Sequence, residues 1–271
     1  MELHPQARAR LIRWFLLFVI LAAIVIGIAW WRSDQLSRKP QPVTAASSGS
    51  VRAVPAEFNK KEHSINDPAS IWVVVNKGRV LPSDYAPANL VSPSVALRLP
   101  ASNLEMQVRR EAAEAMQKLF AAATSDGLRL MLASGYRSYS AQVSVYSAEV
   151  QNNGQAVADQ ESARPGHSEH QTGLAADLEP ASRGCEVMAC FADTAEGKWL
   201  AANAYKYGFI IRYQRGKTSL TGYAYEPWHV RYVGVDLAAE INKTDQTLEQ
   251  FFGLPTYGDY PTQSYELKSG T

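Results

Sequence analysis

The longest apolar run of the chain lies near its N-terminus, where Trp14 to Trp31 forms eighteen residues without a charge. A helix of that length spans roughly 27 Å, close to the thickness of the hydrocarbon core of a bilayer. Tryptophans lie at both ends of the run, as interfacial aromatic residues do. The pattern predicts an uncleaved transmembrane helix over 14–31, preceded by a short tail over 1–13.

A cleaved signal peptide is the alternative interpretation of this run. Its apolar region is normally about 7 to 15 residues long and is followed directly by a small-residue cleavage site. Here Arg32 follows the run, and the nearest small-x-small sequence lies at 43–45. Positive charges are nearly equal on the two sides, so an extracytoplasmic C-terminal domain is expected from the chemistry below rather than from charge.

The remainder of the chain divides by composition. Residues 32–64 are rich in Pro, Ser, Ala and Lys, which predicts a flexible linker that cannot bury enough apolar surface to fold alone. A folded domain is predicted over 65–253. The final segment, 254–271, is polar and rich in Tyr and Pro, and we expect it to be loosely held.

Within the domain, short β-branched runs alternate with segments of helical periodicity. Strands are predicted at 71–76, 128–133, 173–178, 208–213 and 228–233. Helices are predicted at 104–125, 139–151, 194–205, 235–242 and 245–252, the first behind a capping box at Ser102–Glu105. Because the strands and helices show no regular βαβ spacing, an α+β fold is favoured.

Composition narrows the possible functions only slightly. The 271-residue chain is 46% apolar, enough for a sizeable core, and its net charge of +1 offers no electrostatic case for nucleic-acid binding. Its two cysteines, Cys185 and Cys190, are too few for a disulfide scaffold. We expect them to pair outside the membrane and to be free thiols in a cytosolic protein.

Two segments carry candidate metal ligands. ARPGHSEHQTGLAADLEP, at 163–180, contains His170 and Asp177, and TGYAYEPWHVRYVG, at 221–234, contains Glu226 and His229. A hydrolytic zinc site takes three nitrogen or oxygen ligands from the protein and keeps one position for water. The two histidines and Asp177 supply that set, and Glu226 is a carboxylate that could transfer protons.

Spacing alone is a modest argument for this site, because H-x6-D occurs by chance and a lone His beside Gly is more often structural. His167 is a competing ligand, since His167 and His170 would lie on one face of a helix. Pro165, Gly166 and Gly173 argue against a helix there.

Three motifs together resemble a known family. SGYRSYSAQ (134–142), PGHSEHQTGLAADL (165–178) and GYAYEPWHVRYVG (222–234) are similar to the VanY-type zinc D-alanyl-D-alanine carboxypeptidases, metallopeptidases that trim peptidoglycan stem peptides. The family patterns S-x-H-x-x-G-x-A-x-D and E-x-W-H are both matched in full. The resemblance covers about 71–234 and implies a DD-peptidase/hedgehog-like fold, in which the site lies on a small central antiparallel sheet with flanking helices.

The resemblance also implies roles for individual residues. It assigns the zinc ligands to His170, Asp177 and His229. It implies that Glu226 is the general base and acid and that Arg137 polarises the scissile carbonyl. Ser168 and Gln142 are implied to contact the substrate. Without the resemblance, Arg137 would be interpreted as a surface ion-pair residue, Ser168 as a loop-stabilising hydroxyl and Gln142 as an exposed helix residue.

The predicted protein is therefore a membrane-anchored zinc D,D-carboxypeptidase with a monomeric catalytic domain outside the cell membrane. Its expected partners are peptidoglycan stem peptides and, through the N-terminal helix, the membrane, without nucleic acid. An L,D-carboxypeptidase or a peptidoglycan endopeptidase on the same scaffold is the alternative. A non-catalytic wall-binding module is a further alternative, which predicts a missing ligand or base, and none is missing.

Overall fold

The computed structural model describes residues 58–270, which form part of one compact unit, Glu57–Thr271. The helix predicted over 14–31 and most of the predicted linker lie outside the described residues. Among residues 58–270, no helix combines the length and apolar character needed to cross a membrane.

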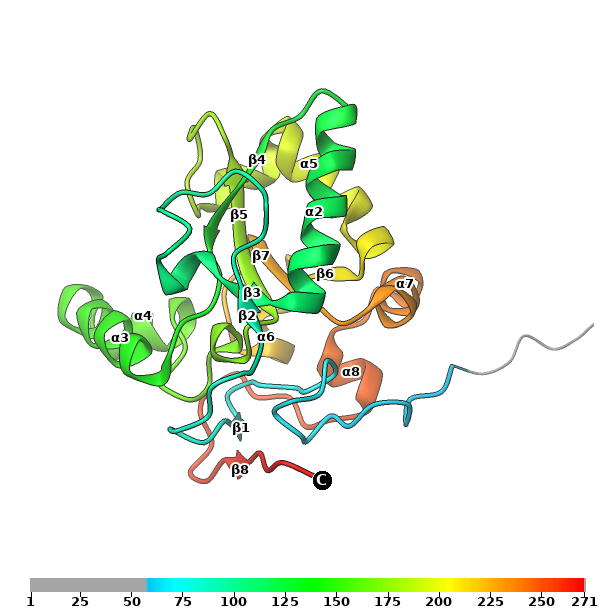
Figure 1. The fold of residues 1–271 in the computed structure, drawn as a ribbon. Coiled ribbons are helices and arrows are strands. Elements are labelled where there is room, and N and C mark those ends of the chain that lie inside the picture. The colour runs from blue at the N-terminus through cyan, green and yellow to red at the C-terminus, as the bar shows by residue number, and fades with distance from the viewer. Residues whose placement is uncertain (1–57, 271) are drawn as a thin grey trace, which may run out of the picture. The chain divides into compact units, whose positions relative to one another are not determined.

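A four-stranded antiparallel sheet forms the centre of the unit (Figure 1). Its strands follow the order β4 (Leu130–Ser134), β5 (Ala175–Pro180), β7 (Glu226–Tyr232) and β6 (Phe209–Tyr213). Two small pairs accompany it: β2 (Leu90–Val91) with β3 (Val108–Arg109), and β1 (Arg79–Val80) with β8 (Tyr265–Glu266). The expected mixed fold with a small antiparallel sheet is therefore present.

Seven α-helices and four short 3-10 helices surround the sheet in the described residues. The α-helices are α2 (Arg110–Ser125), α3 (Tyr139–Asn153), α4 (Gln155–Glu161), α5 (Ala195–Asn203), α6 (Thr218–Thr221), α7 (Val235–Thr244) and α8 (Leu248–Phe252). The 3-10 helices are η1 (Leu104–Met106), η2 (Glu169–Thr172), η3 (Ala189–Asp193) and η4 (Ala204–Tyr207). Figure 1 shows α3 and α4 together on one side of the molecule and α2, α5 and α7 on the other.

The two faces of the sheet differ in chemistry. On one face, Leu132, Leu178 and Val230 are fully buried in the main apolar core, which also includes residues of α2. On the other face, Asp177, His229, Arg212 and Arg231 are buried instead. Because successive side chains of a strand alternate between faces, the polar residues come together on the second face, where the site lies.

The strand predicted at 71–76 is wrong, although its apolar alternation is real. Val73 and Val75 enter the main core, whereas Trp72 and Val74 enter a second apolar cluster beside α7 and α8. Backbone carbonyls of the segment accept hydrogen bonds from the side chains of buried arginines, including Arg231 at 2.7 Å from Val73. The segment is extended but pairs with guanidinium groups instead of a neighbouring strand.

The helix predicted from Leu104 begins at Arg110 instead. Asn103 caps only the short helix η1, and the chain then extends through Gln107 into β3. The Gln107 carbonyl accepts a hydrogen bond from the Tyr136 amide, 2.7 Å away, just after β4. This contact with the segment after β4 holds Gln107, just before β3, in an extended conformation, so tertiary contacts override the local helical periodicity.

The expectation of a loosely held tail is also wrong. Leu267 is fully buried in the main core, and β8 adds to β1. The Tyr260 hydroxyl lies 3.0 Å from that of Tyr223 and accepts a hydrogen bond from the backbone amide of Arg164 at 2.8 Å. The tail is therefore part of the folded domain and contacts segments that border the site.

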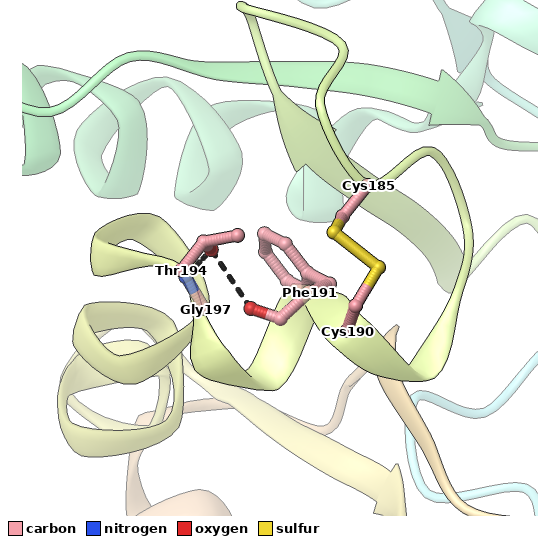
Figure 2. The surroundings of a disulfide bond; sticks show 5 residues. All are labelled: Cys185, Cys190, Phe191, Thr194 and Gly197. Carbon is pink, nitrogen blue, oxygen red and sulfur yellow. Dashed lines mark hydrogen bonds between the residues drawn. A yellow bond between two sulfur atoms is a disulfide. The ribbon is translucent and has the colours of Figure 1, made fainter.

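Cys185 and Cys190 form a disulfide. Figure 2 shows that it ties the loop after β5 to the start of η3, beside the ring of Phe191, which is fully buried. Thr194 then caps α5 through a hydrogen bond from the Gly197 amide, as the sequence predicts. The disulfide thus anchors its loop to a rigid part of the core.

Candidate active site

The three predicted metal ligands lie together on the polar face of the sheet. Asp177 on β5 is paired in register with His229 on β7. His170 belongs to η2, which ends at Gly173 in a left-handed conformation (φ 69°) and leads into β5. One potential ligand atom from each of these three buried residues lies within 4.8 Å of the other two.

The two imidazoles present different nitrogens to Asp177. The Nδ1 of His170 lies 2.6 Å from the Gly135 carbonyl oxygen, so this nitrogen carries the proton and Nε2 faces Asp177 Oδ2 at 3.3 Å. His229 is turned the other way, with Nδ1 at 3.2 Å from Asp177 Oδ1 and Nε2 at 3.5 Å from Glu169 Oε2.

These residues fit a zinc ion. Asp177 Oδ1 is buried and has no hydrogen-bond partner among the described residues. Such an unpaired buried oxygen is costly unless a cation or donor completes it. Two imidazole nitrogens and a carboxylate are also the donor set that zinc accepts in a hydrolytic site. His170, Asp177 and His229 would hold the ion.

The electrostatics of the three residues favour metal binding. Burial lowers the pKa of His170, which keeps its imidazole neutral. Burial opposes charge on Asp177 too, but the neighbouring imidazoles hold the pKa of its carboxyl well below the usual range. For His229, burial lowers the pKa, but the adjacent carboxylates of Asp177 and Glu169 outweigh burial and raise the pKa to about 9. At neutral pH the His229 ring is therefore the imidazolium, with a proton on both nitrogens, unless metal binding displaces one of them.

Glu226 lies beside this cluster at the start of β7. Its Oε2 is 3.6 Å from His229 Nδ1, and a register irregularity between β6 and β7 adjoins its pairing with Tyr213. Burial raises the pKa of Glu226 to about 8, against the opposing effect of His229. A carboxyl group with a pKa near the working pH can both accept and return a proton.

Arg137 follows β4 and is held in place by two side chains. Its Nη1 donates to Gln142 Oε1 at 3.1 Å and its Nη2 to Ser134 Oγ at 3.0 Å. The backbone amide of Arg137 donates to the His170 carbonyl at 3.2 Å. The buried Nε has no partner among the described residues, so this guanidinium retains a donor for another group.

Ser168 and Gln142 both line the same cleft as the metal ligands. Gln142 is buried on α3, where its Nε2 donates to the Ala163 carbonyl at 2.7 Å while its Oε1 accepts from Arg137. It therefore orients Arg137, and its substrate contact stays a prediction. Ser168 precedes η2 without capping it through its side chain, and its substrate contact likewise stays a prediction.

A cleft of about 590 Å³ opens over these residues. Its floor contains His170, Asp177, His229 and Glu226. Its walls come from distant parts of the chain and include Val145 of α3, Met188 of the disulfide loop and Tyr223 before β7. Met188 is 59% exposed, a high value for a large apolar side chain.

His167 is not a ligand. Its Nδ1 lies 2.8 Å from the Asn76 carbonyl oxygen and its ring packs edge-on against Tyr260, 5.0 Å between centroids. Burial lowers its pKa, so the ring is neutral. These structural contacts set the position of His167 apart from the His-Asp-His cluster.

Sequence reasoning missed the charged residues behind His229. Glu169 lies in a polar segment typical of a solvated loop, and it is fully buried against Arg212 and Arg231. The available signal was the presence of arginines inside the apolar strand runs GFIIRY and HVRYV. Charges at inward positions of a buried strand require buried partners of opposite charge.

Comparison with known families and relatives supports the motif-based resemblance. Residues 105–235 match a family model described as VanY, D-alanyl-D-alanine carboxypeptidase. The chain is 46% identical over 189 residues to the YodJ protein of Bacillus subtilis (strain 168), covering 70% of this chain and 69% of that protein. It is 34% identical to a D-alanyl-D-alanine carboxypeptidase of Enterococcus faecalis (strain ATCC 700802 / V583), covering 86% of this chain and 87% of the relative.

Solved structures agree in fold. The LD-carboxypeptidase LdcB is 44% identical with a TM-score of 0.66, over 70% of this chain and 89% of that one. A variant of the vancomycin resistance D,D-pentapeptidase VanY in complex with Zn(II) is 34% identical with a TM-score of 0.54, over 66% of this chain and 97% of that one.

Proposed function

The chain belongs to the VanY family of D-alanyl-D-alanine carboxypeptidases, and we propose that it releases C-terminal D-alanine from peptidoglycan stem peptides. The observation that carries this proposal is the cleft in which a His-Asp-His cluster, Glu226 and Arg137 converge. The cleft thus contains a candidate metal site, a candidate general base and a guanidinium donor, the groups needed to hydrolyse a terminal peptide bond.

Each group has a role in the proposed reaction. A zinc ion held by His170, Asp177 and His229 would supply a Lewis acid and lower the pKa of water at the site. The Glu226 carboxylate takes a proton from the attacking water and returns it to the amine of the leaving D-alanine. Arg137 donates hydrogen bonds either to the oxyanion that forms or to the terminal carboxylate of the substrate.

D-Alanine release from defined peptides tests this function. Full-length wild-type protein with zinc is expected to convert a stem pentapeptide to the tetrapeptide. Glu226→Gln keeps the shape of the side chain but not its basicity, and we expect a loss of about 10²–10⁴ in kcat. Glu114→Gln, on the exposed side of α2, is the matched control and should retain full activity. Absence of D-alanine release by the wild type would reject the proposal.

An L,D-carboxypeptidase is the second candidate, because the structural similarity to LdcB carries the higher identity and TM-score of the two structures compared. The same ligands and base would serve both reactions. Pentapeptide and tetrapeptide substrates separate the two candidates: a D,D-enzyme stops at the tetrapeptide, whereas an L,D-enzyme converts the tetrapeptide to the tripeptide. Mass spectrometry of digested peptidoglycan would also reveal endopeptidase products.

The membrane anchor and the extracytoplasmic location form part of the same proposal. The apolar run at 14–31 supports an anchor. The disulfide Cys185–Cys190 supports an oxidising compartment, since cytosolic thiols are normally kept reduced. Cell fractionation with protease treatment of intact protoplasts tests both features. Recovery of the protein in the soluble cytosolic fraction would reject them.

A further inference from the structure

Next to His229 lies a buried charge network that the proposed reaction does not use, and one of its members, Glu169, also borders the cleft. It consists of Glu169 on η2, Arg212 on β6, Arg231 on β7 and Glu249 on α8, all with no exposed surface or nearly none. We propose that Glu169 is a positioning residue for the metal site, which fixes the ring of His229 and thereby sets the affinity for zinc. This inference rests on the zinc site of the proposed function.

The side chains of Glu169 and His229 face each other through one atom each. Glu169 Oε2 and His229 Nε2 are 3.5 Å apart, and neither atom has a hydrogen-bond partner among the described residues. Both atoms are buried. The Nε2–H of a neutral His229 can therefore be satisfied by this carboxylate oxygen, which leaves the unprotonated Nδ1 directed at Asp177 and the metal position.

Glu169 is itself held in place by two arginines. Its other oxygen, Oε1, accepts hydrogen bonds from Arg212 Nε and from Arg231 Nη1, both at 2.8 Å. With Oε1 held by two guanidinium groups, the position of Oε2 is determined. A carboxylate that orients a metal-binding imidazole is a general device for fixing its tautomer and raising its basicity.

The two arginines are in turn held by residues from other segments. Arg212 pairs with Glu249 through Nη2–Oε1 at 2.6 Å and Nη1–Oε2 at 3.0 Å. Arg231 Nη2 donates to the Val73 carbonyl at 2.7 Å. Val73 and Glu249 lie outside the region 105–235 that matches the family model. The segments flanking that region thus contribute to the position of a metal ligand.

Two carboxylates of the same network provide a matched pair of variants. Glu169→Gln removes the charge next to His229, whereas Glu249→Gln removes a carboxylate of equal burial that contacts Arg212 but not His229. Zinc affinity is measured on the full chain by competition with a chelator, and unfolding of the metal-free protein is measured in parallel. D-Alanine release is not used, so failure of the proposed substrate would not affect the result.

We expect Glu169→Gln to weaken zinc binding by roughly 10- to 100-fold and Glu249→Gln by much less, even if both reduce stability. Equal losses of zinc affinity in the two variants, or a change of less than twofold in Glu169→Gln, would overturn the inference.

A measurement on the wild type covers the case in which a variant does not fold. Long-range ¹H–¹⁵N correlation of the zinc-bound protein reports which nitrogen of His229 carries a proton. The inference expects a proton on Nε2, slowed in exchange by its hydrogen bond to Glu169. A proton on Nδ1, or an Nε2 proton that exchanges as fast as one in solvent, would contradict it.

Discussion

At the scale of single residues, the site depends on how protons are distributed before a metal binds. Two of the four residues, His229 and Glu226, are in their protonated forms at neutral pH. The pKa of His229 is raised to about 9 by its carboxylate partners, and the pKa of Glu226 is raised to about 8 by burial. His170 and Asp177, by contrast, are already in the state that a metal requires, since burial keeps His170 neutral and the imidazoles keep Asp177 ionised.

We therefore predict that zinc binding releases protons at pH 7 and that zinc affinity rises with pH. Because the His229 pKa is raised, the proton is bound below about pH 9 and must leave Nδ1 when the metal binds. Affinity should increase by up to about tenfold per pH unit per proton released, and should level off above pH 9. Calorimetry in buffers of different ionisation enthalpy measures the proton count. A count of zero at pH 7 would disprove the assignment of these protonation states.

A second residue-scale prediction concerns Arg137. Substitution by Lys keeps the charge but loses the planar fork that Ser134 and Gln142 hold. We expect kcat/KM for D-alanine release to fall by about 10²–10³, the cost of losing a donor to a developing oxyanion. Zinc content should be unchanged, because Arg137 is not a ligand. Activity within threefold of wild type would show that the guanidinium plays no part in the reaction.

At the scale of elements, two segments outside the central sheet support the site. The extended segment 71–76 supplies carbonyls to the buried arginines, and the tail 254–271 returns to pair with β1. Tyr223, which lines the cleft, contacts Tyr260 of the tail through their hydroxyls. A residue that lines the cleft is thus held in place by a contact from the C-terminal tail.

We predict that the tail contributes directly to stability. Leu267 is fully buried, and Leu267→Ala should lower the free energy of unfolding by about 2–5 kcal/mol through lost burial and the cavity left behind. Val235→Ala, at a position that is 52% exposed, is the control and should change stability by less than about 0.5 kcal/mol. Denaturant unfolding followed by circular dichroism measures both. Equal, small effects would mean that the tail is only loosely attached in solution.

At the scale of the whole molecule, the disulfide contributes to the shape of the cleft. The bridge closes the loop that carries Val187 and Met188, both of which line the cleft. Val187 adopts a left-handed conformation (φ 48°), which a β-branched residue rarely does. The bridge and the packing of Phe191 together hold this loop against the core.

Removing both cysteines tests that connection. Cys185→Ser with Cys190→Ser opens a short loop, and the chain-entropy relation gives a loss of about 2 kcal/mol in unfolding free energy. We expect KM for the stem peptide to rise more than kcat falls, because the cleft wall loosens while the metal site stays intact. Thermal unfolding with and without reductant, and steady-state kinetics, give the two readouts. Unchanged KM together with unchanged stability would show that the loop is held by other contacts.

The sequence alone predicted the α+β class and most of the sheet strands, and its motifs, through the family resemblance, predicted the ligand set. Local features carry this information: β-branched runs, the Thr194 cap and motifs in which neighbouring positions must face one metal. It also argued against His167 as a ligand, because Pro165, Gly166 and Gly173 disfavour a helix in that segment. The elements follow from residues close together in the chain, whereas the ligand set joins two separate motifs, at 165–178 and 222–234.

Only the tertiary structure decided where non-local partners lie. In the structure, arginine side chains bind backbone carbonyls of 71–76, the first long helix begins at Arg110, and the tail is buried. It also selected the ring nitrogens that face Asp177 and placed Glu169 behind His229. In each case the chain makes contacts with residues far away in the sequence, and no periodicity or spacing encodes which residues those are.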